Sequence, residues 1–93
     1  MYIRWYNTGM EEISTVHPGR SLRGFREAAK MSQGEAARRI SEVTDGRIPP
    51  DRRYVLRAEA GGTDSLTLLR GMAVVYGVPF HDVLAANDAV QKM

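Results

Sequence analysis

The chain has no cysteine, only two histidines and no long hydrophobic run, and these absences exclude several classes of protein. Without cysteine there is neither a disulfide framework nor a thiolate metal site, so a zinc finger is excluded and we expect no metal. No apolar stretch approaches the roughly 20 residues that cross a bilayer, and the N-terminus lacks the basic-then-apolar pattern of a secretory signal. We therefore expect a cytoplasmic protein without membrane contact.

The two histidines of the chain give little support for catalysis. His17 lies beside proline and glycine in an expected linker. His81 opens an expected helix beside Asp82, and neither histidine has a nucleophile or metal partner nearby in sequence. We expect no enzymatic activity, no cofactor and no small-molecule ligand.

The positive charge is concentrated in the middle of the chain. The 93 residues, 43% of them hydrophobic, suffice for one compact core. Residues 20–57 hold ten cations against five anions, a balance of +5, whereas residues 58–93 hold two cations against four anions, a balance of −2. Eleven of the 13 basic residues are arginine, whose planar fork suits phosphates and guanine edges. This asymmetry indicates one surface that faces a polyanion.

Residues 1–19 are expected to form an N-terminal extension. Its first six residues are rich in aromatic and β-branched types and make a candidate β-strand, followed by a linker. Residues 20–86 are expected to fold as one all-α domain of four or five helices. Residues 87–93 are polar, and we expect them to be a fraying C-terminal tail.

Periodicity and capping residues divide residues 20–86 into helices. We expect a first helix over 21–30 and a second that begins at a capping box of Ser32 and Glu35 and ends at about Val43. A third helix should begin at an Asp51 N-cap and end at Gly61. A fourth should begin at a cap within 63–65 and end at Gly77, and a fifth should follow Pro79. The expected core positions are Leu22, Phe25, Ala28, Ala29, Ala36, Ala37, Ile40, Val43, Tyr54, Val55, Ala58, Leu66, Leu68, Leu69, Met72, Ala73, Val75, Tyr76, Val83 and Leu84.

The helix that follows Asp51 carries the pattern most indicative of function. A helical wheel places a basic stripe without any acid on one side and an apolar side opposite. The stripe consists of Arg52, Arg53, Leu56 and Arg57, with Ala60 beside them. Guanidinium forks suit guanine and phosphate, and an aliphatic side chain suits a thymine methyl, so the stripe indicates a major-groove reader. A merely solvated charged face is the alternative.

Three further motifs resemble one family of DNA-binding proteins. They are Ser32-Gln33-x-x-Ala36-Ala37, then Val55-x-x-Ala58-Glu59-x-Gly61, and finally 73–79 followed by Val83-Leu84. From about Leu22 to Leu84, about two-thirds of the chain, the sequence resembles the Cro and lambda-repressor-like (XRE) helix-turn-helix family. The resemblance implies a lambda-repressor-like helix-turn-helix fold that binds double-stranded operator DNA.

The resemblance also implies roles for single residues. Arg52, Arg53, Leu56 and Arg57 match positions that contact bases, and Ser32 and Gln33 match the helix start that contacts phosphate. Arg26 lies seven residues before Gln33, where many members carry an arginine that pairs with the glutamate matched here by Glu59. We also assign Arg38 and Arg47 to the DNA backbone.

The chain departs from the family between its second and third helices. Gln33 and Glu59 are about eight residues further apart than a tight helix-turn-helix connection allows, and the extra length falls on 44–50. The departure makes Arg47 and Ile48 candidates for the interface. Arg47 at the tip could contact phosphate or the minor groove, and a merely solvated loop is an equal alternative.

The function expected from these residues is that of a small phage or bacterial repressor of the Cro or immunity type. We expect a homodimer, because one short helix reads few base pairs. The dimer surface could be the N-terminal strand or the last helix around Phe80, Val83 and Leu84, each of which could equally be core. The alternatives are a helix-turn-helix antitoxin, a phage module that binds a host protein, and an excisionase-like architectural DNA binder.

Overall fold

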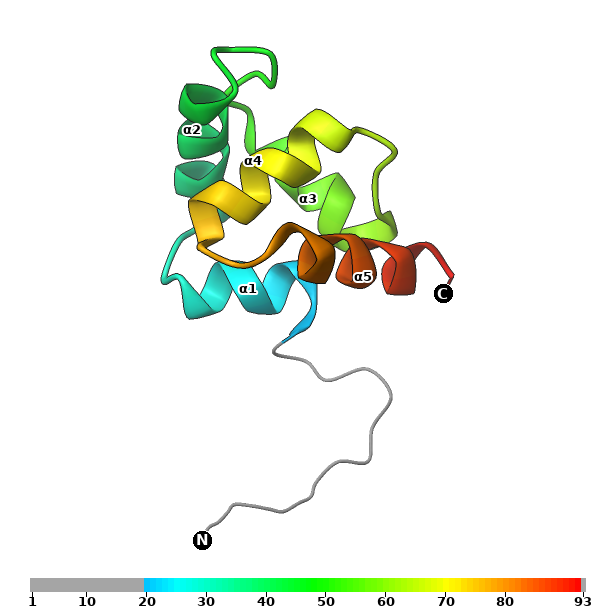
Figure 1. Ribbon diagram of the computed structural model, residues 1–93. Coiled ribbons are helices and arrows are strands. Elements are labelled where there is room, and N and C mark those ends of the chain that lie inside the picture. Colours follow the sequence, from blue (N-terminus) through cyan, green and yellow to red (C-terminus); the bar gives the residue numbers. More distant parts are fainter. Residues whose placement is uncertain (1–19, 93) are drawn as a thin grey trace, which may run out of the picture.

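Five helices follow one another in the computed structural model, which describes residues 20–92 (Figure 1). They are α1 (Leu22–Ala28), α2 (Gln33–Val43), α3 (Arg52–Gly61), α4 (Leu66–Tyr76) and α5 (Phe80–Gln91). The described residues contain no strand, so the all-α expectation is confirmed for them. The extension over 1–19, with its candidate strand, lies outside the described residues. Within 20–92, every helix is too short or too polar to cross a bilayer.

Side-chain caps start four of the helices, and the sequence predicts three of these caps, those of α2, α3 and α4. Ser21 accepts from the amide of Gly24 at 2.8 Å, and Ser32 accepts from Glu35 at 3.1 Å. Asp51 caps α3, and Ser65, one of three candidates, caps α4. A capping box also requires the Glu35 side chain to accept from the Ser32 amide. This part of the prediction is wrong, because the Glu35 carboxylate instead accepts from Arg39 one turn later, at 2.9 Å.

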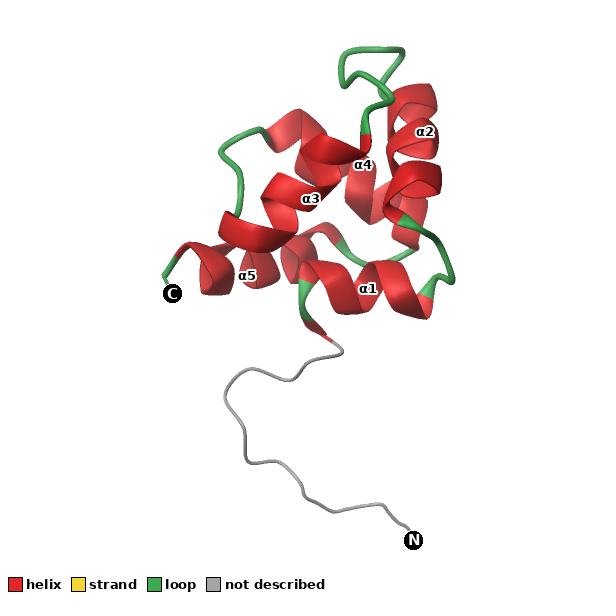
Figure 2. Cartoon of the chain, turned by 180° about the vertical axis from the view of Figure 1, so that it is seen from behind, coloured by secondary structure: helices red, strands yellow, loops and turns green. Residues whose placement is uncertain are grey.

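The helices bury their apolar faces in one core between them. The helix α2 packs against α3 and α4, while α1 contacts α3, α4 and α5. The largest fully buried side chains come from all five helices: Leu22, Ile40, Val55, Leu69, Met72 and Val83. Both views show the α2–α3 connection projecting at the end of the molecule opposite α1 and α5 (Figures 1 and 2).

The helices α2 and α4 approach closely at Gly71 of α4. Ala36 and Ala37 are buried on α2. On α4, a Cβ at Gly71 would lie only 3.0 Å from Ile40 Cγ2 and 3.1 Å from Thr44 Cγ2. The absence of a side chain at Gly71 therefore sets how near the two helices can come.

Several predicted core residues are exposed. The exposed fraction is 47% for Val43 and 55% for Leu66, which are the last residue of α2 and the first of α4. Helix ends extend past the neighbouring helices that would cover them. These positions are therefore exposed although they fit the helical spacing of the apolar residues. Tyr54 in the first turn of α3 and Leu84 on α5 are each 37% exposed, and Ala28 at the end of α1 is exposed as well.

The predicted polar tail over 87–93 is also corrected, because α5 continues to Gln91. Asn87 is buried and holds the backbone of Thr63, accepting from its amide at 2.8 Å and donating to its carbonyl at 2.9 Å. Val90 is buried beyond it. These contacts anchor α5 to the α3–α4 connection and satisfy backbone groups that the connection would otherwise leave unpaired.

The adjacent glycines at the end of α3 test this packing, since only the second requires glycine. Gly62 has φ 78°, and a Cβ there would overlap Gln91 Cγ and lie 3.0 Å from Asn87 Oδ1. We expect Gly62→Ala to lower the free energy of unfolding by about 1–3 kcal/mol. Gly61 is helical with no atom near its Cβ position, so Gly61→Ala should leave stability unchanged or slightly raise it. Urea unfolding measures both, and equal effects would contradict the described packing.

Candidate nucleic-acid interface

A buried ion pair joins α1 to α3, as the sequence predicts for Arg26 and Glu59. Arg26 Nε donates to Glu59 Oε2 at 2.6 Å, and its Nη2 donates to Oε1 at 3.2 Å. Arg26 Nη1 also donates to the carbonyl of Met31 at 2.9 Å. Only 10% of the arginine side chain and 7% of the glutamate side chain are exposed. The hydrogen bond to Glu59 raises the pKa of Arg26, so the guanidinium stays charged.

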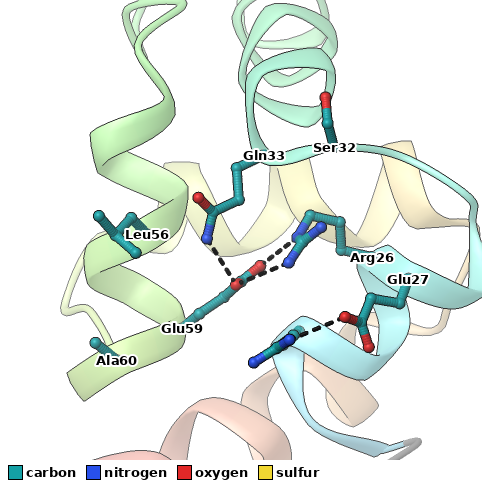
Figure 3. A pocket seen from close by; sticks show the side chains of 8 residues that line it. Arg26, Glu27, Ser32, Gln33, Leu56, Glu59 and Ala60 are labelled. Atoms are coloured by element: carbon teal, nitrogen blue, oxygen red, sulfur yellow. Dashed lines mark hydrogen bonds and ion pairs between the residues drawn. The ribbon is translucent and has the colours of Figure 1, made fainter.

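The start of α2 is attached to the same carboxylate. Gln33 Nε2 donates to Glu59 Oε1 at 3.1 Å. Figure 3 shows Gln33 pointing from the start of α2 toward Glu59, where Arg26 arrives from α1. One carboxylate therefore binds groups from two other helices and sets the C-terminal half of α3 against both of them.

Tyr76 of α4 lies near this pair. Its hydroxyl is buried and has no hydrogen-bond partner within the described range. Burial raises the pKa of Tyr76, and the negative charge of Glu59 raises it further. The phenol therefore stays neutral near the charged pair.

A cleft of about 620 Å³ opens on the outer side of the pair, between α1, the start of α2 and α3 (Figure 3). Its lining residues are Arg23, Arg26, Glu27, Ser32, Gln33, Leu56, Glu59 and Ala60. Leu56 is the one residue of the basic stripe that borders this cleft with the start of α2. The structure thus brings Ser32 and Gln33 together with part of the predicted base-contacting set.

The stripe on α3 is exposed along its length. Val55 and Ala58 on the opposite side of the helix are 0% and 1% exposed. Arg52, Arg53 and Arg57 are all exposed, and Leu56 between them is 41% exposed. The division predicted from the helical wheel is present for these residues, and α3 presents three arginines and a leucine outward.

Sequence reasoning missed an ion pair at the start of this stripe. Arg53 Nη2 donates to Asp51 Oδ2 at 2.6 Å, and Arg53 Nε lies 3.1 and 3.0 Å from Oδ1 and Oδ2. The hydrogen bonds from Arg53 lower the pKa of Asp51 to about 2, and Arg57 adds a weaker attraction. The sequence places this acid two residues before the arginine, a spacing that allows the pair, whereas we expected only a helix cap from Asp51.

The other two predicted backbone contacts face a different side. Arg38 borders a depression shared with Glu35, Glu42 and the α4 residues Val74 and Val75. Arg47 borders a second depression toward α4, with Thr67 and Arg70 among its neighbours. The helix α2 is about 16 Å long, so Arg47 also lies a full helix length from Gln33. The structure therefore does not bring Arg38 and Arg47 to the cleft with Ser32 and Gln33.

The connection between α2 and α3 is tied to α2. Thr44 Oγ1 donates to the carbonyl of Ile40 at 2.8 Å and accepts from the amide of Ile48 at 3.3 Å. Asp45 and Gly46 turn the chain with φ of 55° and 79°. Ile48 is buried in the core with 8% exposure, so its candidacy for the interface is wrong. Residues 44–50 form an anchored projection, with Arg47 exposed near its tip.

The part of the chain that the structure describes contains no cluster of histidine, aspartate and glutamate arranged to hold a metal ion. Comparison with protein-family models, curated proteins and solved structures found no match. The resemblance to the XRE family therefore rests only on the sequence motifs quoted above.

The Glu59 carboxylate should be essential for stability. We expect Glu59→Ala to lower the free energy of unfolding by about 3–5 kcal/mol, because Arg26 would remain buried without its counter-charge. Urea unfolding at neutral pH measures the loss. Glu27→Ala is the matched control, since Glu27 pairs with Arg23 on the surface at 3.0 Å, and it should cost no more than about 1 kcal/mol. Equal losses would show that the buried pair has no special role.

The Asp51–Arg53 pair should be visible in a titration. Because the folded pKa of about 2 lies below the ordinary 3.8, Asp51 stabilises the fold above about pH 4 and loses that effect as pH falls toward 2. Carboxyl-carbon NMR should report a pKa near 2 for Asp51 in the native chain and a higher value in Arg53→Gln. An unchanged Asp51 pKa in that variant would mean that the pair does not form in solution.

Proposed function

We propose that this chain is a sequence-specific regulator of transcription that binds double-stranded DNA, a small repressor of the Cro or immunity type. In this proposal α3 enters the major groove of an operator. The observation that carries it is the outward stripe of arginines and one leucine on α3, beside the start of α2. Val55 and Ala58 on the opposite side of α3 are buried in the core, whereas the stripe is exposed and open to a ligand.

The dimensions and chemistry of α3 support major-groove binding. A helix about 10–12 Å across fits a groove about 12 Å wide. Arginine forks match the O6 and N7 acceptors of guanine, and Leu56 offers an aliphatic surface to a thymine methyl. Leu56 is 41% exposed among the three arginines, so its aliphatic surface is available to a base edge.

The start of α2 supports a phosphate contact beside the groove. The first amides of a helix have no partner within it, and the helix dipole makes that end attractive to anions. At α2 these amides follow Ser32, and the Gln33 side chain is held by Glu59. A phosphate at this position would bridge the cleft between α2 and α3, as the XRE resemblance implies.

We propose a homodimer, because one helix of this length reads too few base pairs for an operator. On α5, Val83 is fully buried and Phe80 packs against the core, whereas Leu84 is 37% exposed. Leu84 is thus the member of that predicted set still available to a second copy. The other predicted dimer surface, in residues 1–6, lies outside the described residues.

A protein-interaction module is the second candidate function. It is favoured by two valines, Val43 and Val74, which are 47% and 67% exposed and border the same two depressions between α2 and α4. A partner protein could cover them, as in an antitoxin or a phage factor that occupies a host protein. The two candidates differ in whether duplex DNA is bound at all.

Selection from a pool of random duplexes separates the two candidates. We expect the enriched sequences to contain guanines within two symmetric half-sites, and binding to weaken steeply between low and moderate salt. Failure to retard any duplex even at low salt would refute the DNA-binding proposal and leave the interaction module.

Two single-arginine variants test whether the stripe makes the contact. With the selected duplex, Arg57→Ala should raise the Kd by about five- to 150-fold, corresponding to 1–3 kcal/mol. Arg38→Ala removes the same charge from an exposed residue on the side facing α4, so its Kd should stay near the native value. Equal losses in gel retardation would show that net charge, and not the face of α3, governs binding.

A further inference from the structure

We infer that Asp51 determines base specificity by holding Arg53 as a reader of guanine. This inference rests on the proposed function, since it names the base that the start of α3 recognises. It assigns to Asp51 a role beyond starting the helix.

Asp51 engages Arg53 in two ways. Its Oδ1 accepts from the Arg53 amide at 2.9 Å, which is the N-cap bond. The same carboxylate also accepts from the side chain of Arg53 through Nε and Nη2. The pair lies at the surface, with 65% of the arginine side chain and 31% of the aspartate side chain exposed. A ligand can therefore reach the guanidinium while Asp51 still holds it.

The atoms that Asp51 uses determine which edge of Arg53 is left for a ligand. A guanidinium carries five N–H donors, one on Nε and two on each terminal nitrogen. Asp51 occupies the edge made by Nε and Nη2. The end made by Nη1 and the second hydrogen of Nη2 stays open and presents two parallel donors.

Two parallel donors suit guanine and disfavour adenine. Guanine offers O6 and N7 as adjacent acceptors in the major groove, whereas adenine offers N7 beside an N6 donor. A guanidinium fixed in direction cannot turn to avoid that donor. A negatively charged carboxylate beside it also repels phosphates, so Asp51 makes the DNA backbone a poor alternative ligand for Arg53.

The other two arginines of the stripe differ in this respect. Within residues 20–92, neither Arg52 nor Arg57 forms an ion pair, and both are exposed. Their long side chains keep the rotamer freedom that lets them follow phosphates as well as bases. Arg53 is the arginine of the stripe whose direction is set before DNA arrives, so we expect it to carry the largest share of base discrimination.

The test separates the ion pair between the Asp51 and Arg53 side chains from the N-cap role of Asp51. Asparagine and serine cap helices about as well as aspartate, but neither carries the charge that holds a guanidinium. Asp51→Asn and Asp51→Ser should therefore keep α3, which circular dichroism checks. Asp45→Asn is the matched control, because it removes the same charge from the exposed connection, at a positive φ of 55° that asparagine tolerates.

Duplex selection with the native chain and with Arg53→Ala first identifies the base pair that Arg53 reads. The Kd ratio between duplexes with adenine and with guanine at that position is then measured for each variant. We expect a native ratio of about five to 150, corresponding to a bidentate contact. Asp51→Asn and Asp51→Ser should lower this ratio about tenfold or to unity, while binding to unrelated duplexes stays equal or tightens. Asp45→Asn should keep the native ratio.

The outcomes distinguish this inference from the proposed function. If the native chain selects a sequence and Arg53→Ala loses a guanine, but both Asp51 variants keep the native ratio, the inference is overturned and the proposed function stands. It is also overturned if Arg53→Ala changes no base preference. If the native chain retards no duplex, the proposed function and this inference fail together.

Discussion

The fold depends on the buried carboxylate of Glu59. It accepts hydrogen bonds from Arg26 on α1 and Gln33 at the start of α2, and so holds three helices at one point. A charge taken out of water is tolerated only when it is paired and hydrogen-bonded, so the geometry around Glu59 has little freedom. The position of α3 against α2 is therefore set near the end of α3, far along the chain from the connection that precedes it.

The two ion pairs of α3 have opposite surroundings and opposite uses. The pair of Arg26 and Glu59 is buried and positions the helix. The pair of Asp51 and Arg53 is at the surface, where an ion pair contributes little to stability. Under the proposed function this pair orients the Arg53 guanidinium before any DNA is bound. One helix thus carries a structural pair near its end and, under the proposed function, a recognition pair at its start.

Local signals in the sequence predicted much of this arrangement. Caps such as Ser32, the closing Gly77 and the buried face of α3 follow from short-range chemistry, and the Arg26–Glu59 pair followed from the family resemblance. The features that the sequence could not predict depend on where neighbouring helices end and how they pack. The exposure of Val43 and the turn of Arg38 toward α4 depend on where α4 ends and packs. The contacts of Asn87 and Asp51 depend on side-chain conformations that only the folded chain defines.

An NMR titration of the chain with its selected duplex tests the central claim most directly. We expect the amide signals of 52–57 on α3 and of Gln33 and Gly34 at the start of α2 to shift most, while those around Val43 and Val74 stay near their free positions. The largest shifts at Val43 and Val74, with α3 unaffected, would contradict the account. They would place the working surface of this protein between α2 and α4.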